Sequence, residues 1–178
     1  MYKAFITGFL VSVLSASGVP PAAASTWPGA EEIVNASPQD AEPLAEPTAP
    51  QPARLHSLLI HAISLIGVKY KFGGSSAESG FDCSGFVRHV FAESMALDLP
   101  RNSYAIAKLG TSVNKDDLQP GDLVFYNTRQ RAFSHVGIYL GEGRFVHAPS
   151  RGKNVEIVDS ADQYWKKRFN GARRVAME

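Results

Sequence analysis

The run Phe81-Asp82-Cys83-Ser84-Gly85-Phe86-Val87 is the place where a loop turns into a helix, and it holds the only cysteine of the chain. The apolar residues of the helix recur on one face, at helical spacing: Phe86, Val87, Val90 and Phe91. Cys83 then lies in the first turn, where unpaired backbone N–H groups and the helix dipole favour a thiolate. The sequence therefore predicts a helix from Cys83 to about Met95 with a nucleophilic thiol at its start.

The residues before this helix fall into segments of different composition. Residues 1–24 have a lysine, a short apolar stretch and then small residues before Ser25, which is typical of a secretory signal peptide. Residues 25–53 alternate proline with acidic residues and alanine, which predicts a disordered linker. The folded domain is expected to cover residues 54–178.

In an exported protein, cysteines usually form disulfides. A single cysteine has no partner within its chain, so its thiol is expected to have another use. The apolar stretch near the N-terminus is too short and too interrupted for stable membrane insertion. Because Cys83 is the only cysteine, no lipid-modified N-terminus is expected either. These observations predict a periplasmic or secreted protein.

The pattern of the domain predicts helices first and strands afterwards. A first amphipathic helix ends at Gly67, and its expected buried stripe is Leu55, Leu58, Leu59, Ala62, Ile63 and Ile66. A short helix through Lys108 ends at Gly110. The predicted strands are 123–126, 134–140, 144–147 and 155–158, and Gly141-Glu142-Gly143 forms a hairpin turn. This order predicts an α+β domain with helices packed on one face of an antiparallel sheet.

Two histidines of the predicted strands can serve the thiol as a base. His135 shares a strand face with Gly137 and Tyr139, opposite the apolar face. Gly137 leaves room there for a ligand or for a closely approaching backbone. His147 on the returning strand can reach the same face, so we expect Cys83 as nucleophile, His135 as general base and acid, and His147 orienting the His135 ring.

Other assignments remain open at this point. Asp122 or Asn127 could orient His135 instead of His147, and each histidine alone could be a buried structural residue. The backbone N–H of Cys83 is expected in the oxyanion hole. We expect His56 and His61 at the surface, and His89 lies too far along its helix for catalysis. No paired Cys or His spacing indicates a zinc site, and no glycine-rich phosphate loop occurs.

The overall composition limits the class of protein. The chain has 178 residues, of which 44% are hydrophobic, enough for one globular domain plus extra segments. A formal net charge of +1 argues against nucleic-acid binding. The basic cluster near the C-terminus (Lys166, Lys167, Arg168, Arg173 and Arg174) is expected to be a solvated surface.

Several spaced motifs resemble those of the NlpC-type family of cell-wall cysteine peptidases. They are Tyr70-x-x-Gly73-Gly74, the Cys83 run, Leu99-Pro100-Arg101, Pro120-Gly121-Asp122-Leu123-Val124, His135-Val136-Gly137-Ile138-Tyr139-Leu140-Gly141 and Phe145-Val146-His147-Ala148. The ending Tyr164-Trp165-Lys166-Lys167-Arg168-Phe169 is most similar to the Spr-type murein endopeptidases of this family.

The resemblance implies a circularly permuted papain-like fold and hydrolysis of peptidoglycan stem peptides or cross-links. It implies the same three roles for Cys83, His135 and His147, and substrate binding or oxyanion stabilisation by Tyr70 and near Ser84. The bond is either D-alanine to diaminopimelate, which the Spr-like ending favours, or γ-D-glutamate to diaminopimelate. No metal or organic cofactor is expected, and the protein is expected to be a monomer. The alternatives are an amidase, an acyltransferase or a non-catalytic cell-wall-binding module.

Overall fold

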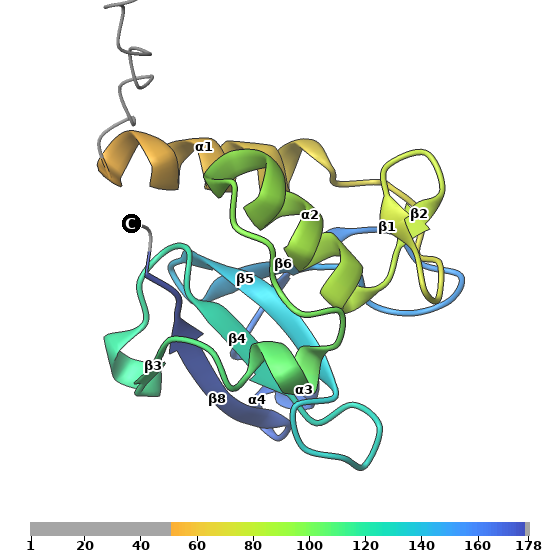
Figure 1. Ribbon diagram of the computed structural model, residues 1–178. Coiled ribbons are helices and arrows are strands. Elements are labelled where there is room, and N and C mark those ends of the chain that lie inside the picture. The colour runs from red at the N-terminus through yellow and green to blue at the C-terminus, as the bar shows by residue number, and fades with distance from the viewer. Residues whose placement is uncertain (1–50, 177–178) are drawn as a thin grey trace, which may run out of the picture. The chain divides into compact units, whose positions relative to one another are not determined.

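The computed structural model describes residues 51–176 (Figure 1). The expected signal peptide and almost all of the expected linker lie outside these residues. The first helix, α1, covers Gln51–Ser64 and so begins slightly before the expected domain start at Arg54. Pro52 is tolerated there because the first N–H groups of a helix have no intrahelical acceptor.

The remaining elements follow the predicted order in the main. They are β1 (Ser75–Ser76), β2 (Gly80–Phe81), α2 (Cys83–Met95), α3 (Ser103–Ile106), β3 (Thr111–Val113), the 3₁₀ turn η1 (Lys115–Asp117), β4 (Leu123–Tyr126), β5 (His135–Gly141), β6 (Arg144–His147), β7 (Glu156–Asp159), α4 (Gln163–Lys166) and β8 (Phe169–Arg174). Helices α1, α2 and α3 come ahead of the six-stranded sheet, but the short strands β1 and β2 precede α2 and the short helix α4 precedes β8. The bounds of α2 are those predicted, and the predicted strands correspond to β4, β5, β6 and β7.

Six strands form one antiparallel sheet in the order β3-β8-β4-β5-β6-β7. The strand β8 was not predicted, and it lies between β3 and β4 (Figure 1). The expectation of a solvated C-terminal cluster is therefore wrong for Arg173 and Arg174, which belong to this strand. Both arginines are only partly exposed. The Arg173 guanidinium donates to the Ala107 carbonyl, and the Arg174 guanidinium donates to the Asp122 carboxylate.

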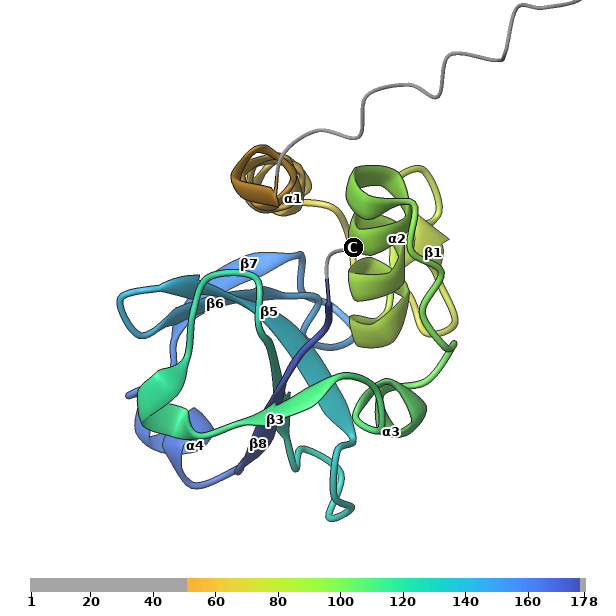
Figure 2. The ribbon, with the colours of Figure 1, turned by 60° about the vertical axis from the view of Figure 1, so that its left-hand side comes forward.

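Helices α1 and α2 pack side by side and cover one face of the sheet (Figure 2). The core on this face joins fully buried side chains of α2 to alternate residues of β4 and β5, among them Phe86, Val90, Phe125, Val136 and Ile138. Each large apolar side chain buried here contributes about 1.5–3 kcal/mol. The α+β architecture is thus confirmed.

The buried face of α1 differs from the predicted stripe. Leu58, Ala62 and Leu65 are buried, whereas Ile63 and Ile66 are 42% and 44% exposed. The helix ends at Ser64, and the chain turns through Gly67 with φ of 91°. Leu58, Ala62 and Leu65 follow the i, i+4, i+7 spacing of one helical face, so the buried stripe is narrower than predicted and ends at Leu65 instead of Ile66.

The opposite face of the sheet carries a second apolar cluster built on Val124, Tyr126, Phe145 and Ala172. Trp165 of α4 packs against this cluster. Tyr139 of β5 also contacts it, while Val136 and Ile138 point into the helix-side core. The predicted alternation of β5 is therefore confirmed, and it places His135 on the side that α4 covers.

Candidate active site

Cys83 is the first residue of α2, and Asp82 is the N-cap. The Asp82 side chain accepts a hydrogen bond of 2.7 Å from the backbone N–H of Gly85, which is the usual N-cap arrangement. The N–H of Cys83 is at the first helical position, where no intrahelical acceptor exists. This N–H is available to a negatively charged oxygen next to the sulfur.

The pKa of the Cys83 thiol is raised, chiefly by burial and then by the Asp82 carboxylate. Backbone N–H groups of Val136 and Ser84 act in the opposite direction but do not outweigh them. The helix start was expected to favour a thiolate, whereas the surroundings of the sulfur act against one. The desolvation of the sulfur and the adjacent carboxylate override the helix dipole.

His135 and His147 form a directly bonded pair of buried rings. The His135 Nε2 lies 2.7 Å from the His147 Nδ1, and the two side chains are on adjacent strands β5 and β6. The residues are 3% and 0% exposed. Because Nε2 of His135 is taken by this bond, its Nδ1 remains for another partner.

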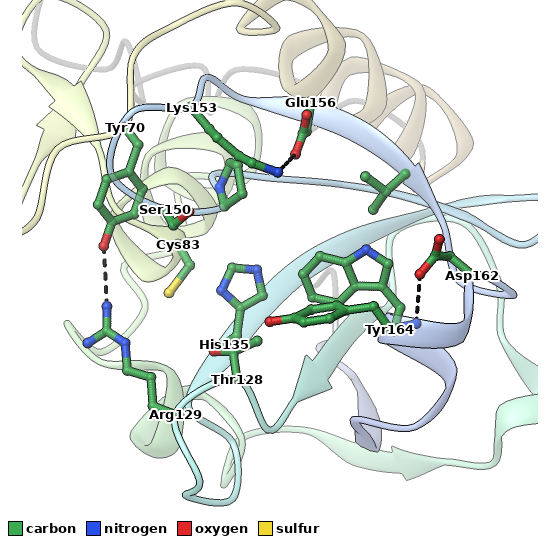
Figure 3. A pocket seen from close by; sticks show the side chains of 13 residues that line it. Tyr70, Cys83, Thr128, Arg129, His135, Ser150, Lys153, Glu156, Asp162 and Tyr164 are labelled. Carbon is green, nitrogen blue, oxygen red and sulfur yellow. Dashed lines mark hydrogen bonds and ion pairs between the residues drawn. The ribbon is translucent and has the colours of Figure 1, made fainter.

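The sulfur of Cys83 and the His135 ring lie next to each other in one pocket (Figure 3). Val136, which follows His135, donates its backbone N–H toward the sulfur. The structure thus brings Cys83, His135 and His147 together in that order. Burial lowers the pKa of His135 to about 3, with the Arg129 charge as a smaller cause, so its ring is neutral at pH 7.

The two other candidates for the orienting group lie elsewhere. Asp122 forms a two-bonded ion pair with Arg174, at 2.8 Å for each bond. The Asn127 side-chain oxygen is buried without a hydrogen-bond partner in the described residues. The 2.7 Å bond of His147 therefore makes His147 the residue that contacts His135 Nε2.

Trp165 covers the histidine pair, a role that no sequence pattern predicts. Its ring stacks on His135 at 5.6 Å between centroids and meets the His147 ring edge-on at 4.9 Å. An aromatic wall of this kind excludes water from the imidazoles, which accounts for part of the burial that lowers their pKa values. Trp165 and His135 are far apart along the chain, so no periodicity connects them.

Gly137 provides close strand packing and not ligand space. A Cβ at this position would lie 2.7 Å from the Phe145 ring and 2.9 Å from the Val146 carbonyl oxygen. The possibility of a ligand beside Gly137 is therefore wrong, and that of a closely approaching backbone is right. This contact draws β6 toward β5 and sets the position of His147.

Ser84 takes part in a charged network with Asp82 and Arg101. Arg101 binds both oxygens of Asp82, at 2.9 and 2.6 Å, and also donates to the Ser84 hydroxyl at 3.0 Å. Burial alone would raise the pKa of Asp82, but the hydrogen bonds from Arg101 and Gly85 lower it overall. Asp82 was not singled out as a functional residue, although an Asp before an apolar helix is a recognisable N-cap pattern.

Tyr70 lies at the rim of the pocket beside Cys83 (Figure 3). Its hydroxyl is 3.4 Å from an Arg129 guanidinium nitrogen. Burial raises the pKa of Tyr70, and the neighbouring Cys83 adds to the effect, so the hydroxyl keeps its proton and can donate it to a ligand.

Two cavities meet at the cysteine. One, of about 480 Å³, contains His135, Lys153 and Glu156, and the other, of about 370 Å³, contains Arg101 and Arg131. Cys83, Tyr70 and Arg129 line both. An extended ligand can therefore pass the sulfur and continue on either side.

The remaining histidines lie away from this site. His61 is half-buried rather than at the surface, and its ring lies 5.4 Å from that of His89, while His56 is exposed. Within residues 51–176, no cluster of three or more His, Cys, Asp or Glu side chains is suited to hold a metal ion. No helix in the same range is long and apolar enough to span a membrane.

The chain is similar to several bacterial hydrolases. It is 47% identical over 109 residues to the "Murein DD-endopeptidase MepS/Murein LD-carboxypeptidase" of Escherichia coli K12, covering 61% of this chain and 56% of the relative. It is 44% identical over 110 residues to the gamma-DL-glutamyl hydrolase of Bacillus subtilis 168, covering 61% of this chain and 26% of that protein. The chain thus spans about half the length, or less, of these curated relatives.

Solved structures agree with the sequence relatives. The NlpC/p60 domain of the peptidoglycan hydrolase SagA superposes with a TM-score of 0.60 at 30% identity, over 68% of this chain and 98% of that domain. This likeness confirms the expected papain-like fold. The NlpC/P60 family profile matches residues 67–174, which include α2 and every strand that carries a residue of the site, and the chain therefore belongs to the NlpC/P60 family.

Proposed function

We propose that this protein is a peptidoglycan endopeptidase that hydrolyses peptide bonds of stem peptides or cross-links, with the Cys83 thiol as nucleophile. The observation that carries the proposal is the position of Cys83, beside a bonded His135–His147 pair and between two cavities. An endopeptidase needs room for the chain on both sides of the bond that it cuts. The relatives' names, a murein endopeptidase and a γ-glutamyl hydrolase, support the same reaction class.

The reaction begins from a neutral thiol and a neutral imidazole. His135 takes the thiol proton at Nδ1 as the sulfur attacks the peptide carbonyl, and then gives this proton to the leaving amine. The C–N bond breaks and a thioester to Cys83 remains. Water, deprotonated by His135, attacks the thioester, releases the carboxylic acid product and restores the thiol.

The carbonyl oxygen becomes negatively charged when the sulfur adds. We assign its stabilisation to the backbone N–H of Cys83 and to the Tyr70 hydroxyl at the pocket rim, which can both donate. Ser84 acts less directly. Its hydroxyl is bonded to Asp82 and Arg101, so it contributes to substrate binding by holding Arg101 at the wall of the second cavity.

We propose the D-alanine to diaminopimelate cross-link as the bond that is cut. The resemblance of the C-terminal motif and the relative named a murein DD-endopeptidase support this bond. The arginines Arg101, Arg129 and Arg131 line the second cavity and suit the free carboxylates of stem peptides. Because the wall lies outside the cytoplasm, we expect the protein to act in the periplasm or after secretion, as a monomer and without a cofactor.

The central test compares wild-type protein with Cys83→Ala on purified peptidoglycan, with products identified by muropeptide mass spectrometry. The variant should release no product, while its circular dichroism and unfolding midpoint stay close to wild type. Unchanged digestion by Cys83→Ala would refute the thiol mechanism. Binding of the folded variant to insoluble wall, measured by pull-down, separates recognition from turnover.

A second experiment identifies the bond, using defined cross-linked and uncrosslinked muropeptides. Cleavage restricted to cross-linked dimers supports the D-alanine to diaminopimelate bond. Cleavage of uncrosslinked stems after γ-D-glutamate supports the other endopeptidase bond. Muramic acid ends free of peptide would instead identify an amidase, transfer of an acyl group to a lipid would identify an acyltransferase, and binding without any product would indicate a wall-binding module.

A further inference from the structure

His147 has one ring nitrogen that the catalytic pair does not use. Its Nδ1 bonds to His135, whereas its Nε2 is buried and has no hydrogen-bond partner within the described residues. The side chain is 0% exposed. Leaving such a group unsatisfied is costly, so any charge near this nitrogen has a strong influence on whether it carries the proton.

Glu156 supplies that charge. It lies on β7 directly opposite His147 in the pairing with β6, so both side chains are on the same face. Its Oε1 is 3.8 Å from the His147 Nε2, beyond hydrogen-bond length but within ion-pair range. Lys153 lies 3.7 Å from the same oxygen, at the pocket rim (Figure 3).

The bond between the histidines can be made in two ways, and the two have opposite consequences. If His147 carries its proton on Nδ1, it donates to His135, and the His135 Nδ1 then bears a proton toward the sulfur. If His147 carries its proton on Nε2, it accepts from His135, and the His135 Nδ1 presents a lone pair. Only the second arrangement leaves a base beside a neutral thiol.

We propose that Glu156 is a positioning residue that holds the proton of His147 on Nε2 and thereby fixes the tautomer of His135. A carboxylate oxygen 3.8 Å away attracts an N–H and repels a nitrogen lone pair. Through the 2.7 Å bond, the choice made at His147 determines which nitrogen of His135 is free. Glu156 on β7 thus acts through His147 on β6 to position His135 on β5.

The surrounding charges agree with a tautomer effect and not with ionisation of His147. Burial lowers the pKa of His147 to about 2, with His135 and then Lys153 as further causes, so the ring stays neutral. Lys153 Nζ lies 3.7 Å from the same Glu156 oxygen, as its ion-pair partner. Asp162 of the α4 N-cap and Arg129 line the same cavity, but neither forms a hydrogen bond or ion pair with either histidine within residues 51–176.

The test replaces Glu156 and observes the tautomers directly by imidazole nitrogen NMR. In wild type, both His135 and His147 should be protonated on Nε2. In Glu156→Leu, which removes the acceptor, a mixture of tautomers should appear. Glu156→Gln keeps an oxygen acceptor and should restore the wild-type state in large part, and Glu93→Leu, an exposed substitution on α2, is the control.

The kinetic part of the test rests on the proposed function. On cross-linked muropeptide, Glu156→Leu should lower kcat about tenfold or more because it affects the base, and Glu156→Gln should recover most of the lost kcat. Wild-type His147 protonated on Nδ1, or Glu156→Leu with unchanged tautomers, overturns the proposal. If wild type cleaves no peptidoglycan, the proposed function fails, but the NMR result still decides the role of Glu156.

Discussion

The partly buried Cys83 thiol beside the buried His135 imidazole exists either as a neutral pair or as an ion pair, and the surroundings decide which. Here burial raises the pKa of Cys83 and lowers that of His135, so both changes favour the neutral pair. Asp82 adds to the first change and Arg129 to the second. In the proposed mechanism, the thiolate is then formed only as the substrate carbonyl is attacked.

The pH dependence of Cys83 alkylation tests this neutral pair. A raised pKa means that the thiolate fraction is low at pH 7 and increases only on the alkaline side. The rate with iodoacetamide should therefore rise steadily with pH and reach half its maximum above about pH 8.5, the usual value for a free cysteine.

The matched reference is the same protein unfolded in urea, in which Cys83 reacts as an ordinary thiol. Because the chain has one cysteine, each adduct is assigned without ambiguity. A plateau of the folded-state rate near pH 6 would show a preformed thiolate–imidazolium pair and contradict the prediction.

Sequence patterns could identify the residues whose chemistry is tied to periodicity. Cys83 begins an apolar helix, and His135 and His147 fall on the same side of two strands joined by a glycine turn. Asp82, Trp165 and Glu156 escaped prediction as site residues because their roles depend on distances across the fold. Glu156, for example, faces His147 only through the register of β6 with β7.

At the scale of elements, the start of α2 depends on Asp82. Its carboxylate receives backbone N–H groups from Gly73 and Gly85 and two bonds from Arg101. The residue is 8% exposed, so its loss leaves several polar groups without partners. This network fixes the helix end that carries Cys83.

Removal of the Asp82 side chain should therefore destabilise the fold. We expect Asp82→Ala to lower the free energy of unfolding by about 3 kcal/mol, since both a cap and a partly buried ion pair are lost. Urea denaturation measures the change. Asp98→Ala is the control, because Asp98 is paired with Arg88 but its side chain is 81% exposed, and its loss should cost less than about 1 kcal/mol. Equal decreases in the free energy of unfolding would show that the bonds of Asp82 stabilise the fold no more than an exposed ion pair does.

Helix α1 shows where element prediction stops. Its position follows from the apolar pattern, but the width of the buried stripe does not. Leu58, Ala62 and Leu65 are buried at helical spacing, whereas Ile63 and Ile66, at the edge of the same apolar face, are exposed. Helical spacing predicts an apolar face, but how much of that face is covered depends on the elements that pack against it.

At the scale of the whole molecule, β8 joins distant parts of the sheet. It pairs with β3 on one side and with β4 on the other. Arg174 at its end binds the Asp122 carboxylate, whose side chain is only 2% exposed. The sequence of β8 is mostly polar and basic, so it has no apolar alternation to predict a strand, and only its neighbours explain its conformation.

We expect Arg174→Gln to lower the free energy of unfolding by roughly 2–3 kcal/mol, because it leaves a buried carboxylate without its cation. Arg144→Gln removes a comparable pair with Glu142 in which both side chains are largely exposed, and should cost less than about 1 kcal/mol. Thermal or urea unfolding of both variants measures the difference. If Arg174→Gln left the free energy of unfolding unchanged, the ion pair with Asp122 would not contribute to stability.

The position of β8 also has a consequence for synthesis. Phe169–Arg174 leave the ribosome after every other described strand, yet they fill the gap between β3 and β4. A nascent chain that stops short of Phe169 has β3 and β4 without the neighbour that unites them, and β4 is the strand that supports His135 through β5. We therefore expect Cys83 and His135 to reach the arrangement described here only after β8 has been synthesised and has paired with β3 and β4.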